Sequence, residues 1–265
     1  MSSFVTRIAV AAIGIPVVLA AAWGGGWWLL ALTAVAGVIG LHEFYALMRP
    51  LRPVVLAGYA GMLLILVAAS RGGLEWMVAG FLATLPIAFV LKGFAETRAP
   101  VTVSVATTML GAGWVGFGLS HLILLRDISE HGVLAVFTVL IAVWAGDTAA
   151  LVTGRMVGRR RLAPTISPGK TWEGLIFGSI ATIFATWICL YRTGFVDGGR
   201  SFLLGAVIAA AAPLGDLFES ALKREMQVKD TGRLLGGHGG MLDRIDSLLF
   251  ASVAAFYVIA GFGAV

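Results

Sequence analysis

Acidic side chains occur at helical spacing in two segments of this apolar chain. Asp216, Ser220 and Lys223 follow one another at i, i+4 and i+7, while Asp243 and Asp246 are separated by three positions. On helices each set lies on one face, so two carboxylate-bearing faces can converge. Facing carboxylates repel each other unless a proton or a cation lies between them, and oxygen ligands without a His or Cys cluster favour Mg²⁺ over zinc. The spacing predicts a divalent-cation site; the alternative is that these acids only pair with neighbouring Lys and Arg.

The segment between these acids, residues 223–246, combines basic residues with glycines. Four cations in it can bind phosphates through charge: Lys223, Arg224, Lys229 and Arg233. Four glycines then lead into a predicted helix, where exposed backbone N–H groups favour an anion: Gly236, Gly237, Gly239 and Gly240. Among them His238 either contacts a phosphate, carries a proton or forms a hydrogen bond within the loop. The segment therefore predicts a polyphosphate ligand beside the cation.

The composition indicates the elements that must position these residues. Hydrophobic residues make up 59% of the 265, and charged residues 12% against about 25% in soluble domains; the mean hydropathy is +0.94. This excludes a soluble nucleic-acid-binding module, and the single Cys189 excludes a disulfide framework. We expect an all-α, polytopic integral membrane protein. About nine apolar segments have the length of a membrane helix: Phe4–Ala22, Trp27–Met48, Val54–Ser70, Leu74–Leu91, Val101–Leu125, Val133–Thr153, Trp172–Tyr191, Phe202–Glu219 and Ile245–Phe262.

The basic residues predict which side of the membrane the loops occupy. With nine spans, fifteen of the nineteen Lys and Arg fall on the side of the N-terminus, and four on the other: Arg71, Arg126, Arg192 and Arg200. By the positive-inside bias the N-terminus is cytoplasmic and the C-terminus is outside. Residues 155–173 hold six charges and residues 216–246 hold eleven, both on the cytoplasmic side.

Six carboxylates lie at or near predicted helix ends on that side. They are expected at about one depth, just inside the cytoplasmic boundary: Asp147, Glu173, Asp216, Glu219, Asp243 and Asp246. Ionisable groups at such a depth are costly and usually face a polar cavity or a partner. The predicted polar site therefore lies at the cytoplasmic boundary of the helices.

The segment from Ser220 to Asp246 resembles the signature of the phosphatidate cytidylyltransferases, also called CDP-diacylglycerol synthases. The family pattern is met at fourteen positions: Ser220, Lys223, Arg224, Lys229, Asp230, Gly232, Leu235, Gly236, His238, Gly239, Gly240, Asp243, Arg244 and Asp246. Two further segments resemble the family, GDTAA from Gly146 to Ala150 and SPGKTWEG from Ser167 to Gly174. The specific resemblance covers roughly residues 145–250, whereas the earlier spans match in character only.

The resemblance implies transfer of CMP from CTP to phosphatidic acid in phospholipid biosynthesis, at the cell inner (plasma) membrane and with the active site on the cytoplasmic side. Asp216, Asp243 and Asp246 would hold Mg²⁺ and a possible second cation. The catalytic set would be these three acids with Lys223 and Arg224. Residues expected to bind substrate are Lys170, Ser220, Lys229, Asp230, His238, Gly239, Gly240 and Arg244. Arg159 to Arg161 would join Lys170 at the phosphatidate headgroup.

Two other functions share some of these features. A CDP-alcohol phosphotransferase handles the same nucleotide lipid, but its Asp-Gly, Ala-Arg, Gly, Asp, Asp run is not found in the sequence. A transporter also needs intramembrane acids and glycines, but here the acids cluster toward one face and no pair of interrupted spans recurs in two halves. We expect one membrane domain over 1–265, in which 1–130 supply N-terminal spans and 131–265 carry the catalytic site. The sequence leaves open whether the chain forms a homodimer.

Overall fold

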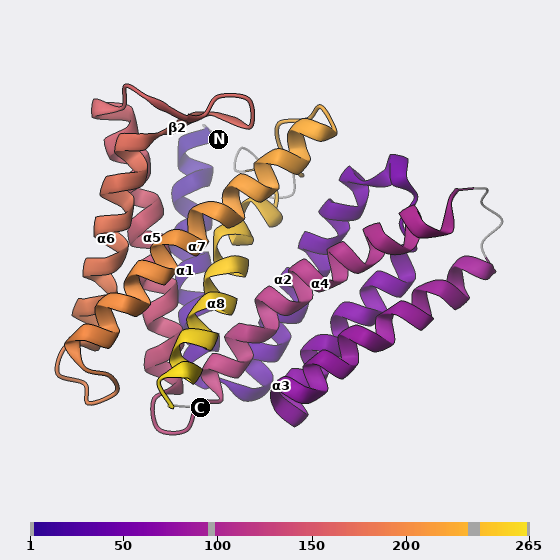
Figure 1. Cartoon of the computed structure of the whole chain (residues 1–265), viewed down its shortest axis with the longest axis horizontal. Helices are drawn as coiled ribbons and strands as arrows, with labels where there is room; N and C mark the ends of the chain where they lie inside the picture. Colours follow the sequence, from indigo (N-terminus) through magenta and orange to yellow (C-terminus); the bar gives the residue numbers. More distant parts are fainter. Residues whose placement is uncertain (1–2, 95–98, 233–238, 264–265) are drawn as a thin grey trace. The chain divides into compact units, whose positions relative to one another are not determined.

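The computed structural model describes residues 3–94, 99–232 and 239–263, and these are almost entirely helical (Figure 1). Seven of the described helices, α2 to α8, are long and apolar enough to cross a membrane. The predicted all-α, polytopic membrane fold is therefore confirmed. The helices are α1 (Ser3–Gly24), α2 (Gly26–Leu47), α3 (Val55–Gly93), α4 (Val101–Arg126), α5 (Gly132–Val157), α6 (Trp172–Leu190), α7 (Gly198–Glu225) and α8 (Leu242–Gly261), with a 3-10 turn η1 (Arg49–Leu51) after α2.

Helix α3 contains two segments that fold back on each other. Its backbone leaves the helical region at Gly73, where φ is 69°. A Cβ at Gly61 would collide with Thr84, and one at Gly80 would lie 3.3 Å from the Cα of Ile65, so the two segments pack antiparallel. They correspond to the predicted spans Val54–Ser70 and Leu74–Leu91, which α3 joins. The count of nine crossings stays a prediction.

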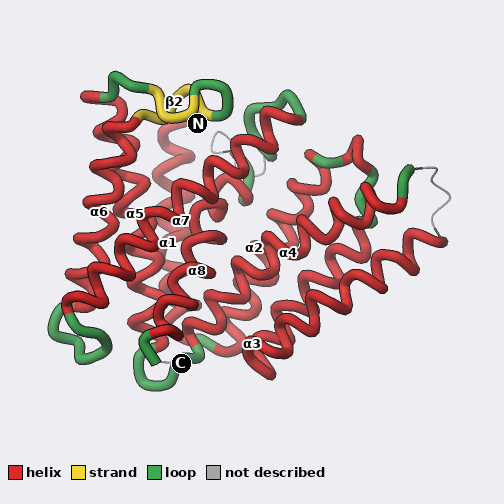
Figure 2. The backbone as a smooth tube through the Cα atoms, viewed as in Figure 1, coloured by secondary structure: helices red, strands yellow, loops and turns green. Residues whose placement is uncertain are grey.

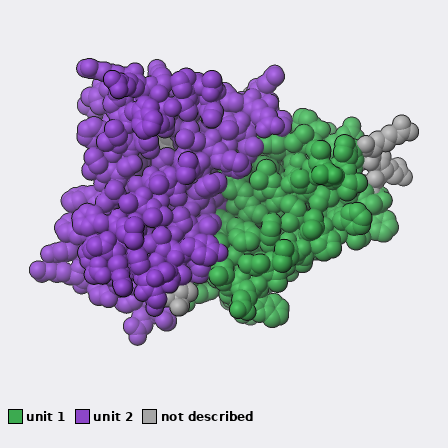
Figure 3. Space-filling model, viewed as in Figure 1, with its two compact units in different colours: residues 1–127, 230–245 green, residues 128–229, 246–265 purple. Residues whose placement is uncertain are grey.

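The chain divides into two compact units (Figure 3). Unit 1 comprises residues 1–127 and 230–245, and unit 2 comprises residues 128–229 and 246–265. The boundary falls inside α8, after its first turn. In unit 1, α4 packs against α3 and α2. Its core includes Phe44, Met62, Ile65 and Leu125, all fully buried.

In unit 2, α5 and α6 lie alongside each other and α7 packs against α6 (Figure 1). Glycines permit this packing: a Cβ at Gly178 would lie 2.9 Å from the carbonyl oxygen of Gly146, and one at Gly205 would lie 2.8 Å from the Cα of Ile183. Small residues at helix contacts are typical of membrane proteins. In lipid there is no hydrophobic force between helices, so they associate through close van der Waals packing of their backbones.

A short antiparallel hairpin connects α5 to α6 (Figure 2). Strand β1 (Arg161–Ala163) pairs with β2 (Ser167–Thr171), with Arg161 opposite Thr171 and Ala163 opposite Ser167. Thr171 then begins α6 as its N-cap, since its hydroxyl accepts a hydrogen bond from the backbone N–H of Gly174 at 3.1 Å. The sequence did not predict this hairpin. It matters because it carries Lys170.

Candidate active site

Asp216 lies at the centre of a polar cluster in unit 2. Its Oδ2 is 2.7 Å from Nζ of Lys170 on β2, and its Oδ1 accepts a hydrogen bond from the Ser220 hydroxyl at 3.4 Å. The pair with Lys170 is partly accessible, since the side chains are 24% and 36% exposed. The predicted face of α7 is therefore confirmed for Asp216 and Ser220, and the hairpin adds the cation.

Asp246 and Glu219 extend this cluster below the surface. Both are buried, with relative exposures of 6% and 1%. Asp246 interacts with the charges of Asp216 and Glu219 and shares a hydrogen bond with Glu219, while Glu219 pairs with Lys223 at 3.2 Å. Three carboxylates so close repel one another unless a proton or a cation lies between them. Lys170 and Lys223 supply two cations to this cluster.

Two Gly-Asp pairs position the acids of this cluster. Gly215 precedes Asp216 on α7, and a Cβ on it would collide with the backbone carbonyl of Asp246 on α8. Gly146 precedes Asp147 on α5, and a Cβ there would collide with the hydroxyl of Thr182. Asp147 also interacts electrostatically with Asp216 and Lys170. In each pair the glycine lets a neighbouring helix approach, so the next residue carries its carboxylate into the cluster.

The hairpin that delivers Lys170 is held by two charged side chains. Nε of Arg224 on α7 donates to the carbonyl of Ile166, in the hairpin turn, at 3.1 Å. Glu173 accepts from the backbone N–H of Arg159 at 3.1 Å and also from that of Arg160. Arg224, predicted to bind phosphate, thus binds backbone in this structure; its role toward substrate stays a prediction. Glu173 thus connects the residues before β1 to the first turn of α6.

A second polar arrangement lies in unit 1, around Asp243. Its Oδ2 accepts hydrogen bonds from the backbone N–H of Thr231 at 3.3 Å, from the Thr231 hydroxyl at 3.0 Å and from the backbone N–H of Gly240 at 2.7 Å. Gly239 has φ of 80°, and a Cβ on it would meet the Asp243 carboxylate. Asp243 therefore holds residues 231 and 240 together, at the two ends of the glycine-rich segment.

Glu43 on α2, near the end of the predicted span Trp27–Met48, belongs to the same arrangement. It is 5% exposed, and its two oxygens accept from the backbone N–H groups of Met241 and Leu242 at 3.0 and 2.8 Å. The N–H groups of residues 240, 241 and 242 thus donate to carboxylates of this chain. A phosphate at the start of α8 would have to compete with them.

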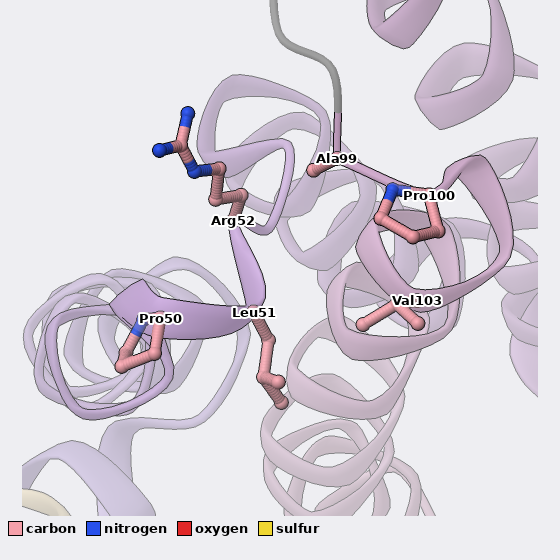
Figure 4. A pocket seen from close by; sticks show the side chains of 6 residues that line it. All are labelled: Pro50, Leu51, Arg52, Ala99, Pro100 and Val103. Atoms are coloured by element: carbon pink, nitrogen blue, oxygen red, sulfur yellow. The ribbon is translucent and has the colours of Figure 1, made fainter.

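The remaining predicted site residues are placed as follows. Lys229, Asp230 and Arg244 are exposed. Arg233 and His238 lie outside the described residues. The pocket in Figure 4 is elsewhere in unit 1: a cavity of about 480 Å³ lined by Pro50, Leu51, Arg52, Ala99, Pro100 and Val103. Its one charged side chain is Arg52, and the predicted site residues do not line it.

The oxygen-rich cluster around Asp216 and Asp246 has the donor chemistry of a Mg²⁺ site. Among the described residues, no three His, Cys, Asp or Glu side chains come together closely enough to hold an ion by themselves. Magnesium bound beside a nucleotide uses one or two carboxylates together with phosphate oxygens and water, so it does not need such a group. The donors around Asp216 and Asp246 are all oxygen, and the ammonium of Lys170 already lies against Asp216 as a cation would. The donor chemistry fits magnesium.

Comparison with known proteins identifies the family of this chain. The model of the Cytidylyltransferase family matches residues 5–262. The chain is 33% identical to a phosphatidate cytidylyltransferase of Brucella suis, over 100% of this chain and 95% of the relative. It is 32% identical to one of Bacillus subtilis, over 85% and 86%, and 33% identical to one of Mycobacterium bovis, over 87% and 79%.

Proposed function

The chain belongs to the cytidylyltransferase family, and we propose that it transfers CMP from CTP to phosphatidic acid, giving CDP-diacylglycerol and pyrophosphate. A phosphate oxygen of the lipid attacks the α-phosphorus of CTP, and the bond from that phosphorus to the bridging oxygen of the β-phosphate breaks. The observation that carries the proposal is the cluster of Asp216, Glu219 and Asp246 on apolar helices with Lys170 on the hairpin. A lipid substrate requires apolar helices, and a polyanionic nucleotide requires charged groups that bind its phosphates and cation.

The nucleophile is already an anionic phosphate, so no serine or cysteine nucleophile is required. The protein has to neutralise repulsion between two polyanions and align them. Lys170 and Lys223 supply two ammonium groups, 2.7 Å from Asp216 and 3.2 Å from Glu219. We assign them to the phosphate oxygens of the substrates and of the leaving pyrophosphate. The hairpin held by Arg224 keeps Lys170 in place for this.

Mg²⁺ is the cofactor we propose, with Asp216 and Asp246 as its protein ligands. When bound, the ion would neutralise charge on the phosphate oxygens of CTP. Asp243 as a further ligand, and a second cation, stay predictions from the sequence. So do the substrate contacts of Lys229, Asp230, His238, Gly239, Gly240 and Arg244.

The chain is a multi-pass membrane protein, and we propose the inner (plasma) membrane as its location. With the nine crossings that the apolar segments predict, the distribution of basic residues favours a cytoplasmic N-terminus and a cytoplasmic active site, where CTP is available. A homodimer stays a prediction.

Pyrophosphate release by the purified full-length protein tests this proposal. Release has to require CTP, phosphatidic acid and Mg²⁺ together, each omitted in turn. Asp216→Asn should lower the rate by about 100-fold or more. Asp197→Asn is the matched control, because Asp197 is exposed, caps α7 through the Arg200 N–H at 2.8 Å, and asparagine caps equally well. Folded protein that releases no pyrophosphate in a lipid-supplemented assay would overturn the proposal and favour a transporter.

A further inference from the structure

Glu43 joins two parts of the chain that are far apart in sequence. It lies on α2, and the groups that it binds, the backbone N–H groups of Met241 and Leu242, are 198 and 199 residues away. Each carboxylate oxygen accepts from one of these successive N–H groups, at 3.0 and 2.8 Å. Groups at the start of a helix lack intrahelical partners, so a carboxylate there satisfies them and interacts favourably with the helix dipole. Glu43 thus caps α8 from another helix.

Two glycines leave the space that the Glu43 carboxylate occupies. A Cβ at Gly240 would lie 2.6 Å from Oε1 of Glu43 and would also collide with Oε2. A Cβ at Gly232 would lie 2.7 Å from its Cδ. Both glycines belong to the segment between Lys223 and Asp246, and neither has a positive φ. They are therefore required for the close approach of this carboxylate rather than for backbone conformation.

Helix α2 also receives the first turn of α8 by packing. Gly40, three residues before Glu43, would with a Cβ lie 3.4 Å from Cδ1 of Ile245 and 3.8 Å from Cδ1 of Leu242. The apolar side chains of Leu242 and Ile245 therefore pack against α2 at Gly40, while Glu43 binds the backbone at the start of α8. Together they fix both the position and the direction of the start of α8 on α2.

Burial makes this contact specific. Glu43 is 5% exposed, and a buried carboxylate is costly unless its oxygens are hydrogen-bonded. Both oxygens are hydrogen-bonded here, so removal of the carboxylate leaves two N–H groups without these acceptors. Asp243 meanwhile binds Thr231 and Gly240 from inside the segment. The two carboxylates therefore have different roles. Asp243 holds Thr231 and Gly240 together, and Glu43 attaches the start of α8 to α2.

We propose that Glu43 is a positioning residue for nucleotide transfer, which fixes the start of α8 and the predicted substrate-binding residues Gly239 and Gly240 so that these two residues can receive the phosphates of CTP. This inference rests on the proposed function. Glu43 touches no substrate; it acts through the backbone of residues 240–242. Its loss should therefore weaken the use of CTP more than the use of phosphatidic acid.

Hydrogen exchange tests the geometry without relying on activity. In Glu43→Gln one oxygen is replaced by an NH₂ group, which cannot accept from a backbone N–H. A peptide covering residues 239–245 should exchange about tenfold faster than in the wild type. Glu75→Gln is the matched control, since Glu75 is an exposed glutamate on a helix of the same unit. Exchange of this peptide within about twofold of wild type in Glu43→Gln would overturn the assigned contact.

Steady-state kinetics then separate positioning from folding. Glu43→Gln should raise KM for CTP by about fivefold or more and leave KM for phosphatidic acid within about twofold. A purely structural role would only reduce the amount of active enzyme, which lowers the maximal rate and leaves both KM values unchanged. Unchanged KM values would therefore overturn the positioning role.

A double-mutant cycle keeps the inference testable if one variant folds poorly. Gly232→Ala should lower kcat/KM for CTP about tenfold in the wild-type background, because the new methyl displaces the Glu43 carboxylate. In the Glu43→Ala background the same change should cost about twofold or less, because the obstructing carboxylate is gone. Equal losses in the two backgrounds would overturn the inference. If the wild type releases no pyrophosphate, the proposed function fails, and hydrogen exchange still decides the Glu43 contact.

Discussion

Gly215→Ala is the sharpest test of how helix packing sets the active site. The added methyl would overlap the carbonyl oxygen of Asp246 and lie 3.1 Å from its carbonyl carbon and 3.2 Å from the Cα of Ser247. All three atoms are backbone, so no side-chain rotation relieves the contact. Helices α7 and α8 must move apart locally by about 1 Å to restore ordinary packing distances.

That displacement separates Asp216 from Asp246. A misplacement of about 1 Å at a reacting centre costs on the order of 100-fold in rate, or about 2.7 kcal/mol of transition-state stabilisation. Overpacking costs about 1–3 kcal/mol of stability, and alanine offsets about 1 kcal/mol of this through its helix propensity. We therefore expect folded protein with a rate of pyrophosphate release lowered about 100-fold.

The assay compares kcat and the unfolding temperature of purified Gly215→Ala with those of Gly198→Ala. Gly198 begins the same helix, and a Cβ there would meet nothing within 4 Å. The control should keep kcat within about twofold of wild type. A folded Gly215→Ala variant with the wild-type kcat would refute the reasoning, because the separation of the two aspartates would then not govern the reaction.

Two further predictions concern charges in each unit. Lys170→Met should lower kcat about tenfold or more, with little change in the unfolding temperature, because a partly exposed ion pair contributes about 1 kcal/mol or less; a wild-type kcat would show that the ammonium does not serve the reaction. Asp243→Asn should weaken the hydrogen bonds from Thr231 and Gly240, each contributing about 1.5–3 kcal/mol to a charged acceptor. Hydrogen exchange of a peptide covering residues 239–243 should then accelerate, and unchanged exchange would contradict the closing role of Asp243.

Hydropathy locates the helices well and their ends less well. The predicted spans Val133–Thr153 and Phe202–Glu219 correspond to α5 and α7, which the structure extends to Gly132–Val157 and Gly198–Glu225. The apolar runs end where charged residues begin, but a helix continues past the apolar region as long as its backbone hydrogen bonds do. Consequently Asp147 lies ten residues before the end of α5 instead of at its exit.

The site was predictable where its residues share one helix. The spacing of Asp216 and Ser220 was enough to place them on one face of α7. It could not show that Lys223 pairs with Glu219 while Lys170 pairs with Asp216, since the second pair depends on the hairpin. The hairpin escaped prediction because its strands are three and five residues long and include a proline and a glycine, which are rare in strands.

Glu43 shows the limit of local patterns. Its position at the end of an apolar span is what an interfacial residue would have, and its partners are backbone N–H groups, which leave no mark on the sequence. The sequence did contain an indication of this contact in the residues that surround the carboxylate, Gly232 and Gly240. The sequence predicts that Gly240 frees an N–H group for phosphate, whereas the structure shows that the missing side chains of Gly232 and Gly240 make room for a carboxylate. A glycine that lacks a positive φ thus points to a close neighbour, and the search for that neighbour leads to Glu43.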